Sequence, residues 1–378
     1  MIFGHSSNSE GAERTLFEVI NELCKSNNNE IILVLPNNRG ALFSYYKNLD
    51  IRIILMNYNW VLQAQGKKQT RLASLKILFW KITFRFKINR NFMNKTNLMN
   101  TDVVITNTSV IPWGGILARK YGFPHIWMIR EDISPDGTMQ AISSRYDIYK
   151  EINDLSDFVL YPSKHVKIKL DSRIRVISDI LYSSPKFMEN ELESTYKYSK
   201  GIHRIAWVGS LTTQKDPLKL IIIAEALKKI QQDFEIHIFG VGELKETLIK
   251  EISDQKLENT LIYRGHTQNM AAEMKFFDFS ISTATNEAFG RSLVESCEFG
   301  VIPIYPIDSS WEERFKESEC GIAYFGIEDI SSKVGTMIQS KELINLKKNV
   351  IRAFNSNFSL EQPHWTLERA INRVRKPD

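Results

Sequence analysis

Short apolar runs alternate with amphipathic helical patterns along this chain, and that alternation restricts its fold more than any other feature. A strand-length apolar run followed by a helix-length pattern is typical of the βαβ unit, whose strands are parallel and covered by helices. The series occurs twice, before and after the polar stretch 183–202. The pattern therefore predicts an α/β protein with two doubly wound, Rossmann-like domains in tandem.

The predicted elements give the domain boundaries. Expected strands are 30–35, 51–55, 102–106, 125–129 and 158–161 in the first half, and 204–208, 234–239, 260–263, 279–282 and 301–304 in the second. Expected helices are 11–23, 218–230 and 243–252, with another opening near Gly290. A chain of 378 residues exceeds one ordinary hydrophobic core. We expect an N-terminal domain over 1–182, a linker over 183–202, a C-terminal domain over 203–357 and a last helix within 358–378.

Composition narrows the class of protein. Hydrophobic residues make up 43% and charged residues 25%, which excludes a disordered or collagen-like chain. The three cysteines are far apart and form no CxxC pattern, which fits a reducing compartment. The first residues resemble no signal peptide, and no run of about 18 apolar residues predicts a membrane span. We therefore expect a cytoplasmic protein.

The positive charge is concentrated in one segment. The net charge is +5, yet no Asp or Glu lies between Asp50 and Asp102, where there are ten Lys and Arg. Without these ten, 39 basic residues stand against 44 acidic ones. No nucleic-acid-binding module is recognisable, so we predict a local anionic partner and no nucleic acid.

Part of this basic segment has the pattern of an interfacial helix. On a helical wheel of 71–87, five apolar residues share one face and lysines and arginines flank it. Cations beside an apolar stripe suit an anionic lipid surface, so we predict membrane contact through 67–95. Ile77, Trp80 and Phe84 lie on the opposite side, so part of this apolar surface could instead be core.

The segment 286–303 carries the most specific chemical signal. Glu287 lies in a loop after a predicted strand, Gly290 allows the turn into a helix, and Glu295 lies about one turn inside that helix. Free N–H groups from Gly290 to Ser292 suit a diphosphate. A carboxylate on either side of that anion site could accept hydrogen bonds from sugar hydroxyls.

Glu-Ala-Phe-Gly-x4-Glu followed by Gly-Val-Ile-Pro303 resembles the retaining family-4 glycosyltransferases of the GT-B fold. The resemblance implies two domains facing across a cleft, and sugar transfer from a UDP- or GDP-linked donor without a metal or other cofactor. Glu287 would act on the transferred sugar as the catalytic carboxylate. The amides of Phe289 and Gly290 would help it, Ser292 would line the donor site, and Glu295 would hold the ribose.

A second donor element is Trp207-Val-Gly-Ser-Leu-Thr-Thr-Gln-Lys215, in which Gly209 ends a strand and Lys215 precedes the next helix. A lysine there could stabilise the departing diphosphate. The family usually has Arg where this chain has Ser210, and Arg291 could replace that cation. His266, after another strand, is a further candidate near the donor, although it could be an ordinary surface residue.

The N-terminal half is expected to bind the acceptor. Gly11 precedes the first helix, where the family places a glycine-rich loop against the diphosphate, although it could serve only the turn. Arg130 and Glu131 end a strand and could hold the acceptor, or form a structural ion pair. The resemblance implies that the last helix crosses back to this domain. The resemblance and the basic segment together suggest a lipid-linked glycan acceptor at the inner face of the cell membrane.

Two alternatives stay open. The first is a non-catalytic GT-B scaffold or partner subunit at the membrane, which the missing arginine at Ser210 favours and the presence of Glu287, Glu295 and Lys215 opposes. The second is a nucleotide-sugar epimerase, whose motifs differ from Glu-Ala-Phe-Gly.

Overall fold

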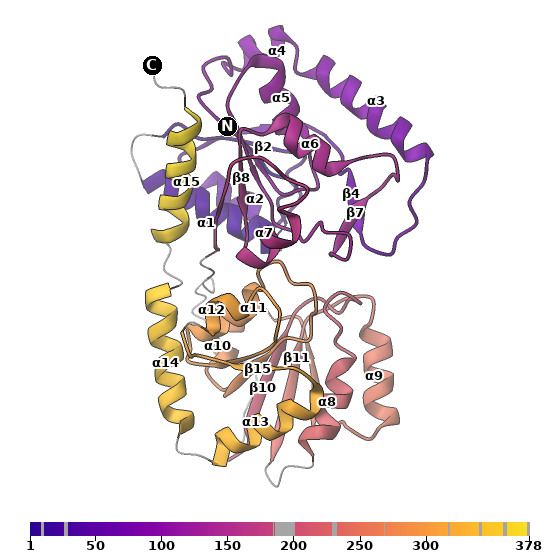
Figure 1. Cartoon of the computed structure of the whole chain (residues 1–378), viewed down its shortest axis with the longest axis vertical. Helices are drawn as coiled ribbons and strands as arrows, with labels where there is room; N and C mark the ends of the chain where they lie inside the picture. Colours follow the sequence, from indigo (N-terminus) through magenta and orange to yellow (C-terminus); the bar gives the residue numbers. More distant parts are fainter. Residues whose placement is uncertain are drawn as a thin grey trace. The chain divides into compact units, whose positions relative to one another are not determined.

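A computed structural model describes residues 1–8, 11–25, 29–183, 185, 201–228, 233–267, 269–316, 318–339, 342–357 and 361–375. The chain forms two compact units (Figure 1). The N-terminal unit comprises Met1–Ser183 with Leu360–Asp378, and the C-terminal unit comprises Ser184–Ser359. The predicted linker 183–202 lies almost wholly outside the described residues.

The N-terminal unit is built on a seven-stranded parallel sheet in the order β3-β2-β1-β5-β6-β8-β9. A separate antiparallel pair joins β4 to β7. The strands of this unit are β1 (Ile2–Phe3), β2 (Ile32–Leu35), β3 (Arg52–Leu55), β4 (Leu62–Ala64), β5 (Val104–Asn107), β6 (His125–Met128), β7 (Met139–Ala141), β8 (Phe158–Tyr161) and β9 (Ser178–Ile180).

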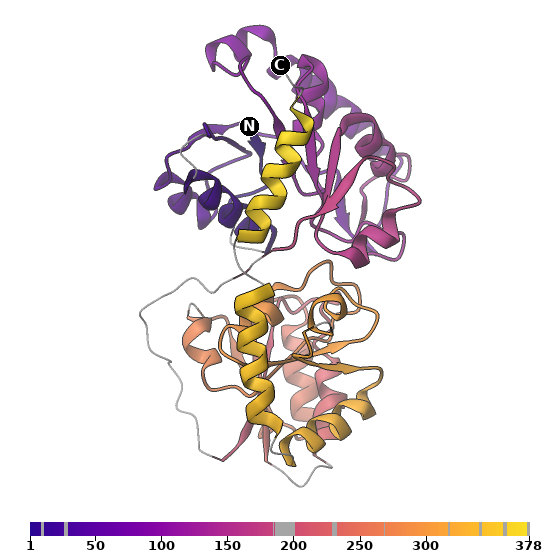
Figure 2. The ribbon, with the colours of Figure 1, turned by 60° about the vertical axis from the view of Figure 1, so that its left-hand side comes forward.

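Helices cover this sheet, and the last helix of the chain is one of them. The helices of the unit are α1 (Gly11–Lys25), α2 (Leu42–Lys47), α3 (Leu72–Lys87), α4 (Arg90–Lys95), α5 (Trp113–Tyr121), α6 (Ile148–Leu155), α7 (Lys164–Leu170) and α15 (Glu361–Val374). The α15 residues Leu367 and Ala370 are buried in the same core as Leu16 and Ile20 of α1. Figure 2 shows α15 lying along the N-terminal unit.

The C-terminal unit repeats this design with a six-stranded parallel sheet in the order β12-β11-β10-β13-β14-β15. Its strands are β10 (His203–Val208), β11 (Phe234–Phe239), β12 (Leu261–Gly265), β13 (Phe279–Ile281), β14 (Ile302–Pro306) and β15 (Ile322–Tyr324). Its helices are α8 (Lys219–Leu227), α9 (Lys245–Asp254), α10 (Met270–Met274), α11 (Arg291–Cys297), α12 (Glu312–Phe315), α13 (Ile327–Gln339) and α14 (Glu342–Asn357).

In each sheet, the order in which the chain adds strands reverses at one pair of neighbouring strands. In the N-terminal unit, β1 continues to β2 on one side, and the chain adds β5 on the other. In the C-terminal unit, β10 and β13 are the corresponding pair. Ligands of doubly wound sheets bind outside the carboxyl ends of such strands. The prediction of two Rossmann-like domains is confirmed, and it identifies the two places where side chains should form sites.

Candidate functional site

The loops after β10 and β13 bring Lys215 and Glu287 together. The Lys215 ammonium and the Glu287 carboxylate form an ion pair, although 72 residues separate them. Thr283 fixes the backbone of Lys215, because its Oγ1 donates a hydrogen bond to the Lys215 carbonyl at 2.7 Å. Trp207 Nε1 in turn donates to Thr283 Oγ1 at 2.9 Å. The loop that carries the lysine is thus fixed to both central strands.

Gly290 makes the sharp entry into α11. Its φ of 74° lies in the left-handed region, which favours glycine. A Cβ at this position would overlap the indole ring of Trp311. Trp311 is fully buried, and its Nε1 donates to the Gly290 carbonyl at 3.1 Å. The first N–H groups of α11 have no partners within the helix. The predicted strand–loop–helix geometry around Gly290 is therefore present.

Glu295 lies on the buried side of α11. Its side chain is 5% exposed, and Arg291 Nη2 lies 3.1 Å from its Oε1. Arg291 therefore lies beside Glu295, the residue that is predicted to bind the ribose. Phe289 is buried at the start of the same turn, with the Arg314 guanidinium 5.7 Å from its ring centre. Ser292 is half-buried in the first turn.

Gly209 ends β10 in close contact with the next loop. Its carbonyl oxygen occupies the space that a Cβ on Gly240 would need, and Gly240 has a φ of 149°. Leu211 N donates to the Val241 carbonyl at 2.9 Å. Here the glycines serve close packing of two loops, while Ser210 is exposed.

His266 is exposed directly after β12, the edge strand of this sheet. In the sheet, β11 lies between β12 and β10, the strand that leads to Lys215.

A second polar cluster lies at the carboxyl ends of β1, β5 and β6 in the N-terminal unit. His5 Nε2 lies 3.0 Å from Glu13 Oε1, and Ser6 Oγ also donates to that oxygen. The backbone N–H of Ser109 donates to Glu131 Oε2 at 2.9 Å. Arg130 Nε donates to Asn107 Oδ1 at 3.0 Å. Arg130 and Glu131 therefore bond to different partners, Asn107 and Ser109.

The pKa values of the two carboxyl groups of this cluster shift in opposite directions. Burial raises the pKa of Glu131 above its usual value, although the bond from Ser109 opposes the shift. Burial would also raise the pKa of Glu13, but the bonds from His5 and Ser6 hold it below its usual value. The cluster thus combines one carboxylate stabilised in its charged form with one carboxyl that is costly to ionise.

The backbone of this cluster is strained. Thr108 has a φ of 89°, which is a rare conformation for a β-branched residue. Among the residues that the structure describes, the buried atoms Ser109 Oγ and Glu13 Oε2 have no hydrogen-bond partner. Buried polar atoms without partners are unfavourable. Their presence beside strained backbone marks this strand end as a candidate binding site.

Two further residues border the cluster. Gly11 is exposed and opens α1, and Thr15 Oγ1 donates to its carbonyl at 3.0 Å. The Trp60 ring centre lies 5.4 Å from that of His5, its Nε1 donates to the His5 carbonyl, and the side chain is 43% exposed.

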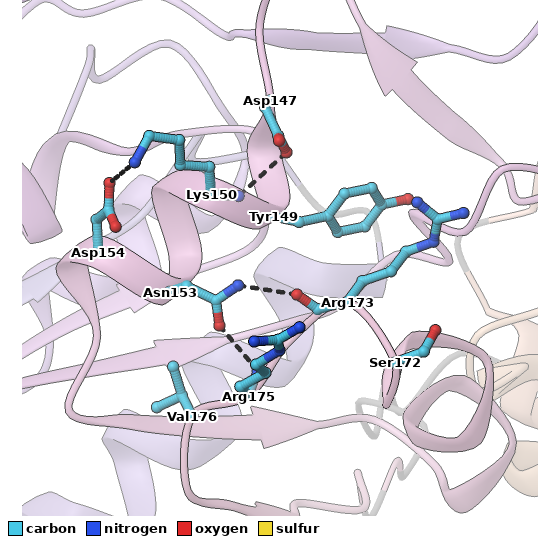
Figure 3. A pocket seen from close by; sticks show the side chains of 9 residues that line it. All are labelled: Asp147, Tyr149, Lys150, Asn153, Asp154, Ser172, Arg173, Arg175 and Val176. Atoms are coloured by element: carbon cyan, nitrogen blue, oxygen red, sulfur yellow. Dashed lines mark hydrogen bonds and ion pairs between the residues drawn. The ribbon is translucent and has the colours of Figure 1, made fainter.

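A separate hollow of about 540 Å³ lies beside α6 (Figure 3). Arg173 covers the Tyr149 ring at 5.0 Å, while Lys150 pairs with Asp154 at 2.8 Å. Its charged groups are mostly exposed, and none belongs to either cluster described above.

The sequence predicted Lys215, Glu287 and Glu295 but missed the residues that support the two loops around them. Thr283 follows β13, and Trp311 and Arg314 lie at the start of and within α12; none of the three carries a motif of its own. His5, Glu13 and Trp60 were missed for the same reason. The one available signal was topological, since each of these segments follows a strand or opens a helix.

No group of three or more His, Cys, Asp or Glu side chains that could hold a metal occurs in the described part of the chain.

Comparison with known proteins finds a family match within the C-terminal unit. Residues 196–352 match the family model described as glycosyl transferases group 1. This region carries a glycosyltransferase group 1 domain, and the prediction of a glycosyltransferase is confirmed for that domain. Assignment to family 4 and retention of configuration remain predictions.

Two curated relatives have similar sequences. The chain is 24% identical over 254 residues to a poly(ribitol-phosphate) alpha-N-acetylglucosaminyltransferase of Staphylococcus aureus (strain COL), covering 65% of this chain and 50% of that relative. It is 30% identical over 107 residues to a poly(glycerol-phosphate) alpha-glucosyltransferase of Bacillus subtilis (strain 168), covering 28% of this chain and 16% of that protein. The chain thus spans half or less of the length of these relatives.

The whole chain resembles a solved GT-B structure. The crystal structure of Anabaena HepE in complex with UDP and glucose aligns with a TM-score of 0.72 at 15% identity, covering 98% of both chains. The predicted GT-B fold is confirmed.

Proposed function

We propose that this protein transfers a sugar from a nucleotide diphosphate to a hydroxyl group of a glycan or polyol-phosphate acceptor, with retention of anomeric configuration. The observation that carries the proposal is the pairing of Lys215 with Glu287 at the β10–β13 strand ends, inside a glycosyltransferase group 1 domain. A cation and a carboxylate at that point match the two ends of the bond to be broken.

The donor is proposed to bind with its pyrophosphate at Lys215 and the first turn of α11. Positive charge and N–H groups there would stabilise the negative charge that develops on the leaving diphosphate. Glu295 would accept hydrogen bonds from the ribose, and Arg291 would hold its carboxylate in place. Because Lys215 supplies the neutralising charge, the proposal includes no metal ion and no cofactor beyond the UDP- or GDP-linked donor.

Glu287 is proposed to act on the transferred sugar. Its carboxylate would accept hydrogen bonds from sugar hydroxyls and stabilise the positive charge that develops at the anomeric carbon. The acceptor oxygen would bond to that carbon as the bond to the phosphate oxygen breaks. The departing phosphate oxygen would take the acceptor's proton, so the attack comes from the face that the diphosphate leaves.

The names of the two curated relatives support retention and suggest the acceptor. Both names specify an alpha product and an acceptor polymer of polyol phosphate. Common UDP-sugar donors carry the alpha linkage, so an alpha product requires retained configuration. We extend this to the present chain as a proposal, with the growing polymer or glycan carried on a lipid at the inner membrane face.

The second polar cluster, in the N-terminal unit, is proposed to bind the acceptor. Its buried atoms without partners, Ser109 Oγ and Glu13 Oε2, suit a ligand rich in hydroxyl groups. Arg130 and Glu131 would orient the attacking hydroxyl, and exposed Trp60 would stack on a sugar or polyol face.

The proposed function is tested by incubating the protein with UDP- and GDP-sugars and with polyol-phosphate or glycolipid acceptors. NMR should show a product whose new linkage has the anomeric configuration of the donor. An inverted product would overturn retention. Donor binding without turnover in any combination would favour the scaffold alternative, and conversion of the donor without acceptor would favour an epimerase.

A further inference from the structure

Helix α3 turns an apolar stripe to solvent. The stripe consists of six large side chains that are between 46% and 72% exposed: Leu72, Leu75, Leu78, Phe79, Ile82 and Phe86. They recur at intervals of three and four residues, which places them on one side of a helix. An exposed apolar surface of this kind marks an interaction site.

The opposite side of α3 already serves as core. Ala73, Ile77 and Phe84 are buried, and the Phe84 ring centre lies 5.0 Å from that of Trp113. The open question from the sequence is therefore settled for this helix. Ile77 and Phe84 belong to the core, Trp80 is half-buried, and the six-residue stripe is exposed.

Exposed positive charge lies on α3 and on the segments before and after it. Eight of the ten cations of this segment are exposed: Lys67, Lys68, Arg71, Lys76, Arg85, Lys87, Arg90 and Lys95. Within the described residues, none of the eight has a carboxylate partner. Lys81 differs, because it pairs with Glu151 and lies over the Tyr146 ring at 5.1 Å. Lys81 therefore contributes to the fold.

We infer that α3 and its flanking cations dock on an anionic lipid surface. A bilayer offers hydrocarbon to the stripe and negative headgroups to the lysines and arginines at the same time. A second copy of α3 would bring two strongly basic segments together, which like-charge repulsion opposes. A soluble polyanion would bind the cations but would leave the stripe in water.

The helix lies flat on this surface. The described residues contain no helix both long and apolar enough to cross a bilayer. The stripe reaches about 5–10 Å into the headgroup boundary, while the long basic side chains extend to the phosphates. The purpose of docking rests on the proposed function: it brings the protein to a lipid-linked acceptor. The exposed stripe and its charges are independent of that function.

Vesicle flotation with the full-length protein tests the inference. The protein should float with vesicles of phosphatidylcholine and phosphatidylglycerol, float less with phosphatidylcholine alone, and dissociate as salt is raised. Replacing Leu75, Phe79 and Phe86 by serine should abolish flotation. The triple variant Lys76→Glu/Arg85→Glu/Lys87→Glu should lower partitioning about 100-fold or more, from a contribution of about 1 kcal/mol for each basic residue.

Matched controls exclude a general effect of apolar surface. Ile168 on α7 and Ile344 on α14 are 76% and 66% exposed, and their serine variants should float like the wild type. Failure of the wild type to float, or unchanged flotation of both triple variants, would overturn the inference. Concentration-dependent dimerisation lost only in the serine variant would overturn it in favour of a second copy.

Donor binding separates this inference from the proposed function. Both triple variants should keep the thermal stabilisation that UDP or GDP gives to the wild type. If UDP and GDP stabilise neither the wild type nor the variants while the wild type still floats, the result contradicts the proposed function and leaves the lipid inference standing.

Discussion

Lys215 and Glu287, 72 residues apart in sequence, form an ion pair where the central strands of the C-terminal unit end. Their side chains are 29% and 18% exposed, so both remain open to solvent on one side. Each compensates the other's charge in this structure. In the proposed reaction the same two groups bind opposite ends of the breaking bond, the lysine the phosphate and the glutamate the sugar.

The first prediction concerns the lysine. Lys215→Met should lower the rate of sugar transfer about 10²–10³-fold, because it removes a cation aimed at developing negative charge. Lys219→Met is the control, since Lys219 lies at the start of α8 and pairs with Asp216 at 3.0 Å. Steady-state kinetics of both variants provide the measurement. Equal losses in the two variants would contradict the role given to Lys215.

The second prediction separates the two glutamates. Glu287→Gln should lower kcat, because Glu287 is proposed to stabilise charge that exists only in the transition state. Glu295→Gln should mainly raise the KM for the donor, because the ribose is bound equally in both states. The reverse assignment in donor-saturation kinetics would show that the two roles are exchanged. Glu298→Gln, at the end of α11, should change neither constant.

The third prediction concerns the turn into α11. Gly290→Ala should lower the stability of the C-terminal unit by about 2–4 kcal/mol, because left-handed strain adds to overlap with Trp311. Gly122 is a matched glycine with a φ of 75° and nothing within 4 Å of the added Cβ. Gly122→Ala should cost only about 1 kcal/mol. Denaturant unfolding compares them, and equal costs would exclude a contribution from Trp311.

The fourth prediction concerns Glu131. Burial raises the pKa of this carboxyl, so Glu131→Gln should leave the stability of the N-terminal unit unchanged or raise it by about 1 kcal/mol at neutral pH. The same change should reduce transfer and raise the KM for the acceptor, because the proposed orienting group is lost. A fall in stability together with unchanged kinetics would indicate a structural role only.

The fifth prediction concerns acid stability. Burial lowers the pKa of His125 to about 4, and it lowers the pKa of His237 to about 4 as well. Between roughly pH 6.5 and pH 4 the unfolded chain binds protons that these folded histidines do not, so stability should fall as the pH decreases through that window. For His125 the loss should approach about 3 kcal/mol. Denaturation midpoints measured against pH test this.

A direct readout accompanies that measurement. NMR titration should show the His125 ring neutral down to about pH 4, and His125→Gln should flatten the pH dependence of stability. A ring that titrates near pH 6.5 would contradict the prediction.

Much of the fold follows from the sequence because buried parallel strands are continuous apolar runs. The runs 158–161 and 234–239 coincide with β8 and β11. β1 was not predicted, although it lies in the middle of its sheet, because Ile2–Phe3 is too short to show any periodicity. Its position depends on pairing with β2 and β5, which is information that a local pattern does not contain.

The candidate site was predictable only where a motif marks it. Glu287, Gly290 and Glu295 stand at fixed spacing, and Lys215 follows a recognisable strand end. Trp311 reaches Gly290 from a loop 21 residues further along the chain, and His5, which follows β1, meets Glu13 in α1. Such contacts depend on tertiary packing. The basic helix illustrates the same limit, since its wheel showed two apolar faces and only the structure shows which one is buried.

The most direct test of the central claim is calorimetric titration of UDP, UMP, GDP and GMP into the wild type and Lys215→Met. The account predicts that the diphosphate of the preferred base binds at least about ten-fold more tightly than its monophosphate, and that this difference is clearly smaller in Lys215→Met, where only the N–H groups at the start of α11 remain to bind the pyrophosphate. A difference that persists undiminished in the variant would contradict the claim that Lys215 binds the donor pyrophosphate.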